Sequence, residues 1–232
     1  MNILAFDTAF DACSVAAGRG LRSLAPSIMA FSESMTTGHA ERLMPMVAEV
    51  LAEVGMDIGQ LDRIAVSRGP GTFTGTRITI AAARALALYA GTPVVSISTL
   101  QLMAMNRAAN ASGSSEVAIA TDARRGEVYF ERFNPHSLVS LGPPEVLSCA
   151  DAAARLGSGR SVVAGSGGEA VAKAARAIGR NALATAADLS PDAFDLLFAA
   201  MELNDFNTVQ PLYLRPPDAK PQNGALLARN PV

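Results

Sequence analysis

The chain has 232 residues; half are hydrophobic and 17% are charged, which excludes a disordered chain and predicts one compact unit or two small lobes. A net charge of −2 argues against a protein that grips nucleic acid through its overall charge, although a share in a composite RNA surface stays open. The two cysteines, Cys13 and Cys149, form no CxxC pair, so we expect no zinc site, no disulfide framework and a reducing cytoplasm. No signal peptide and no membrane helix are expected.

The first half of the chain predicts three strands followed by alternating helices and strands. Strands expected at 3–6, 13–17 and 24–33 make an antiparallel meander. The next helix is amphipathic and contains Pro45; its candidate caps are residues 36–38. Its apolar stripe consists of Leu43, Met46, Val47, Val50, Leu51 and Val54. Then come a strand at 64–67, an alanine-rich helix over 75–90 that ends at Gly91, a strand at 94–97 and a helix over 98–109.

The second half repeats a similar order after a polar linker at 110–115. We expect strands at 117–121 and 127–133, a helix at 149–156, a strand at 161–165 and a helix at 169–178. A last helix has a stripe made of Phe194, Leu197, Phe198 and Met201. The proline-rich tail from Pro211 should be extended or loosely ordered. The recurrence predicts two α/β lobes, an N-terminal lobe over 1–109 and a C-terminal lobe over 110–232, and leaves open whether the last helix packs back on the first lobe.

Asp7 is the first candidate site residue, because it ends a buried strand just before a turn. Actin-like ATPases hold metal-bound phosphate at such a carboxylate, but their turns contain glycine, which lets backbone N–H groups approach the phosphate. Here the turn at 9–12 has no glycine, and Asp11 adds negative charge. A cap of the turn and a phosphate site are both kept as interpretations.

A glycine-rich loop between the strand at 64–67 and the alanine-rich helix is the second candidate. Exposed N–H groups at a helix N-terminus suit an anion, and the loop matches neither the Walker pattern nor the dinucleotide pattern. A purely structural turn is an equal alternative. The loop residues of interest are Gly69, Gly71, Thr72, Thr74 and Gly75. A weaker glycine-rich candidate lies at 165–168.

Other chemistry has little support in the sequence. His39 and His136 belong to no HExxH or HxxxH pair, which argues against a metallopeptidase. Ser166 lies in no GxSxG elbow and is expected in a cap loop. Arg124 and Arg125 occupy a turn that could hold a phosphate or carboxylate, or could be a solvated hairpin turn.

The two early helices carry more small and apolar groups than one buried face needs. Met44 lies off the stripe of the first helix, and the second helix has small side chains over several turns. Most of this surface must face the core; a patch for another subunit and a wholly buried surface are both kept as interpretations.

Six segments together resemble the TsaB family, formerly YeaZ, from one end of the chain to the other. They read ILAFDT at 3–8, HAERLMPM at 39–46, GPGTFTGTR at 69–77, VVSISTL at 94–100, DARRGEVY at 122–129 and YLRPPDAKPQ at 213–222. The chain departs from the family at Thr72, where serine is usual, at Thr76, where leucine or valine is usual, and at Thr79, where glycine is common.

The resemblance implies an α/β actin-like (ASKHA, ribonuclease H-like) fold of two lobes with mixed sheets. It implies a non-catalytic subunit that binds and activates TsaD, together with the ATPase TsaE, for threonylcarbamoyl transfer to the adenosine 3′ of the tRNA anticodon. TsaD-like proteins hold a metal with a histidine pair that this chain lacks, so we expect no catalysis by the chain alone and no cofactor of its own. ATP, ADP and metal are expected on the partner subunits.

The resemblance also implies that the two early helices dock on matching helices of TsaD. The interface residues carried over are Leu43, Met44, Val47, Arg77, Ile78, Ala81, Ala82 and Ala85. Whether the free chain pairs with itself through the same patch is left open. The alternative function is an active small ATPase or sugar kinase of the same fold, motivated by Asp7 and the loop at 69–75.

Overall fold

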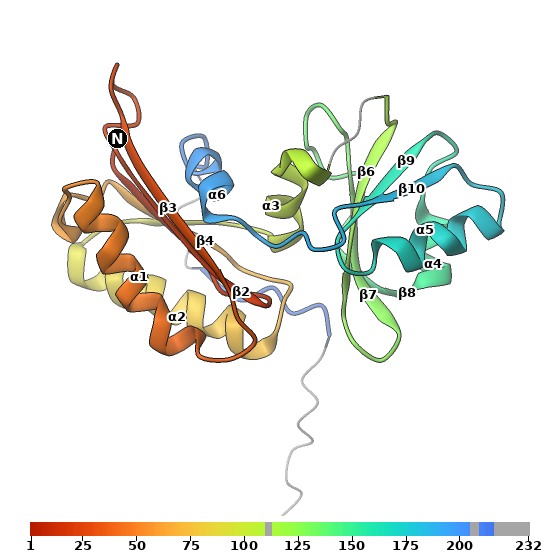
Figure 1. Ribbon diagram of the computed structural model, residues 1–232, viewed down its shortest axis with the longest axis horizontal. Coiled ribbons are helices and arrows are strands. Elements are labelled where there is room, and N and C mark those ends of the chain that lie inside the picture. Colours follow the sequence, from red (N-terminus) through yellow and green to blue (C-terminus); the bar gives the residue numbers. More distant parts are fainter. Residues whose placement is uncertain (110–112, 205–208, 216–232) are drawn as a thin grey trace, which may run out of the picture.

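The computed structural model describes residues 1–109, 113–204 and 209–215, which form two lobes side by side (Figure 1). Half of the linker expected at 110–115 and most of the proline-rich tail lie outside these ranges. Within them, no helix is both long enough and apolar enough to cross a membrane.

The first lobe is built on a five-stranded mixed sheet with the strand order β3-β2-β1-β4-β5. Its strands are β1 (Ile3–Asp7), β2 (Ala12–Arg19), β3 (Ser27–Ser34), β4 (Arg63–Ser67) and β5 (Val94–Ile97). The first three form the predicted antiparallel meander, and β4 and β5 run parallel to β1. Every residue of β1 and β4 is buried, as expected for central strands covered on both faces.

One face of this sheet is covered by α1 (His39–Glu53) and α2 (Phe73–Ala90). All six residues of the predicted α1 stripe enter the core. Of the three candidate caps, the residue at the N-cap is Gly38, whose φ of 86° favours glycine. α2 ends at Gly91 as predicted, with a φ of 64°. The short 3₁₀ helix η1 (Ile58–Gln60) leads from α1 to β4.

The second lobe has the strand order β10-β9-β6-β7-β8. Its strands are β6 (Glu116–Asp122), β7 (Glu127–Phe133), β8 (Glu145–Ser148), β9 (Ser161–Ala164) and β10 (Ala182–Thr185), with α4 (Cys149–Arg155) and α5 (Gly168–Ala177) on one face. The sequence predicted neither β8 nor β10. Both are four-residue strands at the edges of the sheet, and neither is a continuous buried run like β9, so the hydrophobic pattern gives little signal for them.

The two lobes have the same topology. In each, three antiparallel strands are followed by helix, strand, helix, strand and helix, so β1 corresponds to β6 and β4 to β9. Asp7 and Asp122 therefore end equivalent strands, and the loops after β4 and β9 are equivalent as well. This duplicated arrangement is the predicted actin-like, ribonuclease H-like fold.

The last helix of each half packs on the sheet of the other lobe. α3 (Thr99–Met105) follows β5 but packs on β6 and β7, and α6 (Ala193–Ala199) follows β10 but packs on β1, β2 and β4. Figure 1 shows α3 between the two sheets. α3 is shorter than expected; the 3₁₀ helix η2 (Arg107–Ala109) continues it.

The predicted stripe of α6 is wrong in part. Phe194 and Phe198 are each 43% exposed, whereas the buried face consists of Ala193, Leu196, Leu197 and Ala200. Two contacts set this rotation. The backbone N–H of Ala193 donates to the buried Ser14 hydroxyl at 2.9 Å, and Asp192 caps the helix by accepting from the backbone N–H of Phe194. Alanines at the contact let the helix lie close to the small residues of the sheet.

Candidate functional site

Asp7 lies at the end of β1 and is only 1% exposed. One carboxylate oxygen accepts a hydrogen bond from the Ser67 hydroxyl, and the other accepts from the backbone N–H of Ala9 at 3.0 Å. Burial raises the pKa of the Asp7 carboxyl to about 6, although both hydrogen bonds oppose this shift. Both oxygens are thus bound by the chain itself.

The raised pKa of Asp7 makes the stability of the protein depend on pH. An unfolded aspartate has a pKa of about 3.9, so the folded state holds the proton more tightly. The corresponding stabilisation is present below about pH 4 and is lost as the pH rises through 6. A shift of this size corresponds to roughly 2 to 3 kcal/mol between the two limits.

The glycine-rich loop packs directly against the turn that follows Asp7. A Cβ atom added at Gly75 would lie 1.9 Å from the carbonyl oxygen of Thr8, and one at Gly71 would lie 2.6 Å from the carbonyl oxygen of Ala9. The backbone N–H of Thr72 donates to Ala9 O at 2.7 Å. The structure therefore brings the two predicted candidates together, with the glycines of the loop in close contact with backbone carbonyls of the turn.

The remaining loop residues also have internal roles. Thr72 caps α2, because its hydroxyl accepts from the backbone N–H of Gly75 at 3.1 Å. Gly69 has a φ of 96°, and a Cβ there would lie 3.1 Å from the carbonyl oxygen of Leu212. Thr74 is exposed.

Thr79 completes the contact between α2 and the turn. Its hydroxyl accepts from the backbone N–H of Thr8 at 3.0 Å and lies 2.7 Å from the Thr8 hydroxyl, which is 2.8 Å from the carbonyl oxygen of Gly75. Thr79 is fully buried, so the side chain that replaces the common family glycine faces inward and takes no room on the outer surface of α2.

Phe10, in the same turn, reaches the region between the lobes. Its half-buried side chain packs against a cluster formed by α3 and the second sheet, which includes Leu100, Val117, Ile119 and Phe133. His39 supports the turn from the start of α1, with its Nε2 atom 2.9 Å from the carbonyl oxygen of Phe10. His136 lies exposed in the other lobe. Across the described ranges, no group of three or more His, Cys, Asp or Glu is placed to hold a metal ion.

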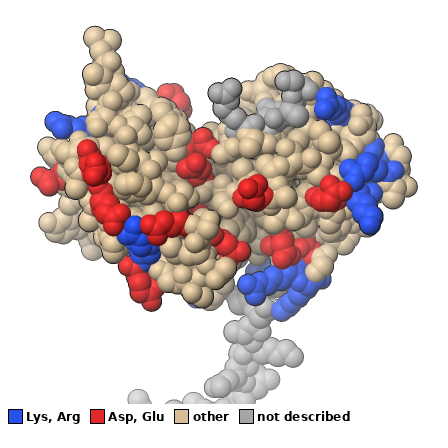
Figure 2. Space-filling view, viewed as in Figure 1, with Lys and Arg blue, Asp and Glu red and all other residues tan. Residues whose placement is uncertain are grey.

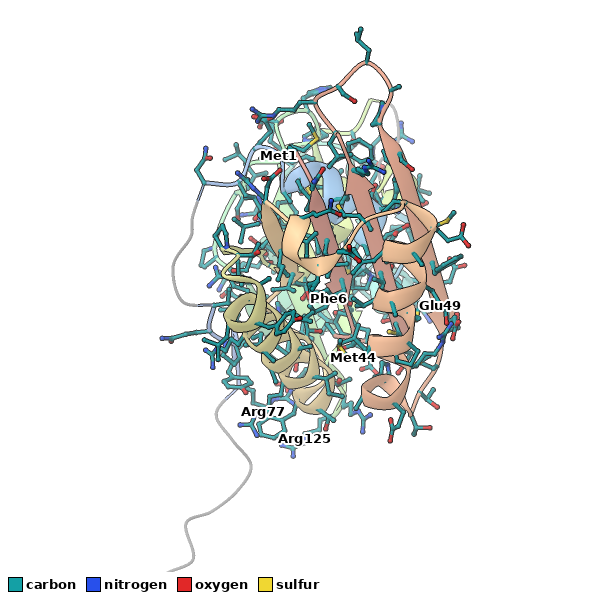
Figure 3. All side chains as sticks on the ribbon, turned by 90° about the vertical axis from the view of Figure 1, so that its left-hand side faces the viewer. Met1, Phe6, Met44, Glu49, Arg77 and Arg125 are labelled. Carbon is teal, nitrogen blue, oxygen red and sulfur yellow. The ribbon has the colours of Figure 1, made fainter. Side chains whose placement is uncertain are left out.

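The outer sides of α1 and α2 form an exposed apolar face. On α1, Met44 is 44% exposed and shares its side with Ala40 and Ala48. On α2 the exposed residues Ala81, Ala85 and Leu88 recur at helical spacing, and Leu88 is 88% exposed. Figure 3 looks onto this face, where the two helices lie side by side. We call it the helix-pair face.

Part of the predicted interface must be corrected. Leu43 and Val47 are 1% and 2% exposed and belong to the core of the first lobe, so they lie beneath the surface and cannot contact a partner. Ile78 and Ala82 are half-buried, and Arg77 is exposed near the start of α2.

Sequence reasoning missed two exposed residues, Leu88 on the helix-pair face and Tyr89 beside it, which are 88% and 79% exposed. The signal was present, since Leu88 continues the spacing of Ala81 and Ala85 on the side of α2 opposite its buried residues.

In the second lobe, the turn between β6 and β7 has an unusual backbone. Arg124, Arg125 and Gly126 have φ values of 63°, 58° and 74°. The Asp122 carboxylate accepts from the backbone N–H of Arg124 at 2.8 Å, which holds the turn. Ser166 also contacts the turn, because its hydroxyl accepts a hydrogen bond from the backbone N–H of Asp122 at 2.9 Å.

The loop at 165–168 resembles the first glycine-rich loop in its packing. Cβ atoms added at Gly165 and Gly168 would lie 2.6 Å from Ala120 O and 2.8 Å from Val163 O. These glycines, too, face backbone carbonyls of the same chain.

The duplicated topology and the equivalent strand-end turns define an actin-like protein of two lobes. A family model described as TsaD, tRNA N6-adenosine threonylcarbamoyltransferase, matches residues 33–209. The structure of YeaZ from Pseudomonas aeruginosa superposes with a TM-score of 0.77 at 33% identity, covering 92% of this chain and 99% of that one.

Curated relatives agree with this match. The TsaB protein of Escherichia coli is 41% identical over 133 residues, 57% of this chain and 55% of that protein, so the aligned part of the chain spans about half the length of this relative. An uncharacterized protein of Mycobacterium tuberculosis is 33% identical over 223 residues, 95% of this chain and 94% of that protein. The chain belongs to the TsaB (YeaZ) family.

Proposed function

We propose that this chain is a non-catalytic subunit in the synthesis of N6-threonylcarbamoyladenosine on tRNA. It binds and activates TsaD, together with TsaE, for threonylcarbamoyl transfer to the adenosine 3′ of the anticodon. The observation that carries the proposal is the exposed apolar helix-pair face, which no described residue of the chain covers. Monomeric proteins rarely leave contiguous apolar patches exposed unless the patch binds something.

The composition of the helix-pair face favours another helix pair as its occupant. Small side chains such as Ala48, Ala81 and Ala85 let helices approach to about 8 to 10 Å between axes. Met44 and Leu88 supply larger apolar groups that can fill the grooves of a partner. TsaD, whose family model matches this chain, is the partner that we propose.

The packing of the glycine-rich loop supports a subunit without its own phosphate chemistry. An anion loop presents N–H groups to its ligand, whereas here the carbonyl oxygens of Thr8 and Ala9 lie against Gly75 and Gly71. A carbonyl oxygen carries partial negative charge and repels phosphate. We therefore assign the nucleotide and metal to the partner subunits. The free thiols of Cys13 and Cys149 fit a reducing cytoplasm.

Reconstitution tests the proposal. A mixture of TsaD, TsaE, tRNA and threonylcarbamoyl adenylate is assayed for modified adenosine with and without this chain, and the chain is also assayed alone. We expect product only when the chain and TsaD are both present. Equal product without the chain would refute the proposal. Tight binding and turnover of Mg-ATP by the chain alone, measured by calorimetry, would favour the kinase alternative.

A further inference from the structure

Two aromatic rings and an arginine form an exposed cluster at the start of α2. The guanidinium carbon of Arg77 lies 3.5 Å from the ring centroid of Phe73, and Arg77 Nε donates to the Tyr213 hydroxyl at 2.8 Å. The two rings are stacked, with centroids 5.8 Å apart and planes inclined by 28°. Phe73 remains 52% exposed and Tyr213 44% exposed, so ring surface is open to a ligand.

The segment at 209–215 joins this cluster to the arginine turn of the second lobe. Val209 packs in the core beside α2, and the backbone N–H of Leu212 donates to Arg68 O at 2.7 Å. Two residues beyond Tyr213, Arg215 donates to the carbonyl oxygen of Ala123 at 3.1 Å and to the Glu127 carboxylate. The cluster and the turn are thus neighbours, because two residues of extended chain span only about 7 Å.

Several arginines lie around the aromatic cluster and the arginine turn, in a molecule that is acidic overall. Arg77, Arg124 and Arg125 are exposed, and Arg215 is half-buried. Figure 2 shows a group of basic side chains at the lower end of the second lobe, where Figure 1 places the turn between β6 and β7. Figure 3 places Arg77 and Arg125 at the same end of the molecule. We call the Phe73, Arg77 and Tyr213 cluster together with Arg124 and Arg125 the arginine–aromatic surface.

We propose that the arginine–aromatic surface binds a single-stranded segment of RNA, with an unpaired base on the aromatic rings and phosphates at the arginine turn. This inference rests on the proposed function, because it assigns the surface to the tRNA substrate. Exposed aromatic rings interleaved with arginine are the groups that hold unstacked bases, and adjacent arginines pair with phosphate oxygens. A purely apolar protein contact would not need three exposed guanidinium groups at its edge.

The backbone of the turn is held firmly, so its two arginine side chains start from fixed positions. Its backbone is closed by hydrogen bonds from Ala123 N–H to Glu127 O at 2.9 Å and from Glu127 N–H to Arg124 O at 3.1 Å. Arg215 adds its own contacts from the side of the first lobe. A phosphate that binds here does not have to order the backbone of the turn, which reduces the entropic cost of binding.

The test measures binding of an unmodified tRNA transcript by fluorescence anisotropy, for the chain alone and for its complex with TsaD, at several salt concentrations. The combined variant R124E/R125E should weaken tRNA binding by a factor of ten or more and lower the salt slope by about 1.4, that is about 0.7 for each lost single-strand phosphate contact. Tyr213→Ala should weaken binding about tenfold, whereas Tyr213→Phe, which keeps the ring, should bind within twofold of wild type. Lys173→Glu, a single charge reversal on the exposed side of α5, is the control for a charge change elsewhere on the molecule and should bind like wild type.

Retention of TsaD is measured for every variant in parallel. Loss of tRNA affinity with TsaD retained supports the proposal. Wild-type tRNA affinity and salt slope in the double arginine variant overturn it. Loss of TsaD retention with tRNA affinity intact also overturns it, because the surface is then a protein interface, while the proposed function stands. Failure of the wild-type chain to support modification counts against the proposed function instead.

Discussion

Replacing Gly75 by alanine tests whether the glycine-rich loop packs on the turn after β1 and is not an anion site. The added Cβ would lie 1.9 Å from the carbonyl oxygen of Thr8 and 2.7 Å from the hydroxyl oxygen of Thr72. Cβ atoms essentially never come closer than 3.0 Å to such atoms. The turn after β1 must therefore move away from α2 by about 1 Å or more.

The cost of this movement follows from the groups it disturbs. Overpacking of a tight site costs about 1 to 3 kcal/mol. The movement also strains the hydrogen bonds of Thr8 to Thr79 and to Gly75 O, each worth about 1 kcal/mol. The better helix propensity of alanine returns up to about 1 kcal/mol. We expect a net loss of about 3 kcal/mol, which lowers the melting temperature of a chain of this length by about 6 to 12 °C.

Urea and thermal unfolding of the purified variant measure this loss. Gly59→Ala is the matched control, since a Cβ at Gly59 meets nothing within 4 Å and its φ is not positive. We expect the free energy of unfolding of that control to lie within about 0.5 kcal/mol of the wild-type value.

Equal stability of the Gly75 and Gly59 variants would refute the packing argument. If Gly75→Ala kept the wild-type midpoint but lost binding of a nucleotide, the space at Gly75 would belong to a ligand, and the loop would be an anion site after all.

Three further predictions test the site and the interface. Thr79→Val should cost about 1 to 3 kcal/mol of unfolding free energy, because the backbone N–H of Thr8 loses its hydrogen-bond partner. Thr79→Ser keeps the hydroxyl and should retain most of the wild-type stability. Equal urea midpoints for the two variants would contradict this. The stability of Asp7→Asn relative to wild type should rise by about 2 kcal/mol between pH 4 and pH 8, because wild type loses stability as Asp7 ionises with a pKa of about 6 and asparagine does not ionise. A difference in stability that does not change with pH would show that Asp7 does not titrate as described. Met44→Glu should keep its free energy of unfolding within about 0.5 kcal/mol of wild type but fail to retain TsaD in co-purification. Val50→Asp, at a fully buried position, should lose about 4 kcal/mol or more of unfolding free energy and aggregate. A Met44 variant that retains TsaD like wild type would remove that residue from the proposed interface.

The difference between the residues expected at an interface and those exposed on the helix-pair face has a simple cause. The apolar stripe of α1 predicts which residues are buried, and the structure buries all of them. Leu43 and Val47 belong to this stripe, so their inclusion in a partner surface conflicted with the periodicity of the helix. The exposed face follows from the other side of the same helix, where Ala40, Met44 and Ala48 are spaced four residues apart.

The error at α6 has a different origin. Phe194 and Phe198 are large and apolar, so spacing alone favours them as core residues. The small residues Ala193 and Ala200 are buried instead, because the hydrogen bond from Ala193 N–H to Ser14, 179 positions away, turns the helix. No local pattern in the sequence carries that contact.

The sequence by itself determined the meander, the stripe of α1, the cap of α2 at Gly91 and the repeat of two α/β halves, because alternation, helical period and turn residues are local signals. The tertiary structure alone decided what the loop glycines face. The contact between Thr8 and Gly75 joins positions 67 residues apart, and that between Arg77 and Tyr213 joins positions 136 apart. Such contacts depend on how separate elements pack together, and packing is a property of the folded chain as a whole.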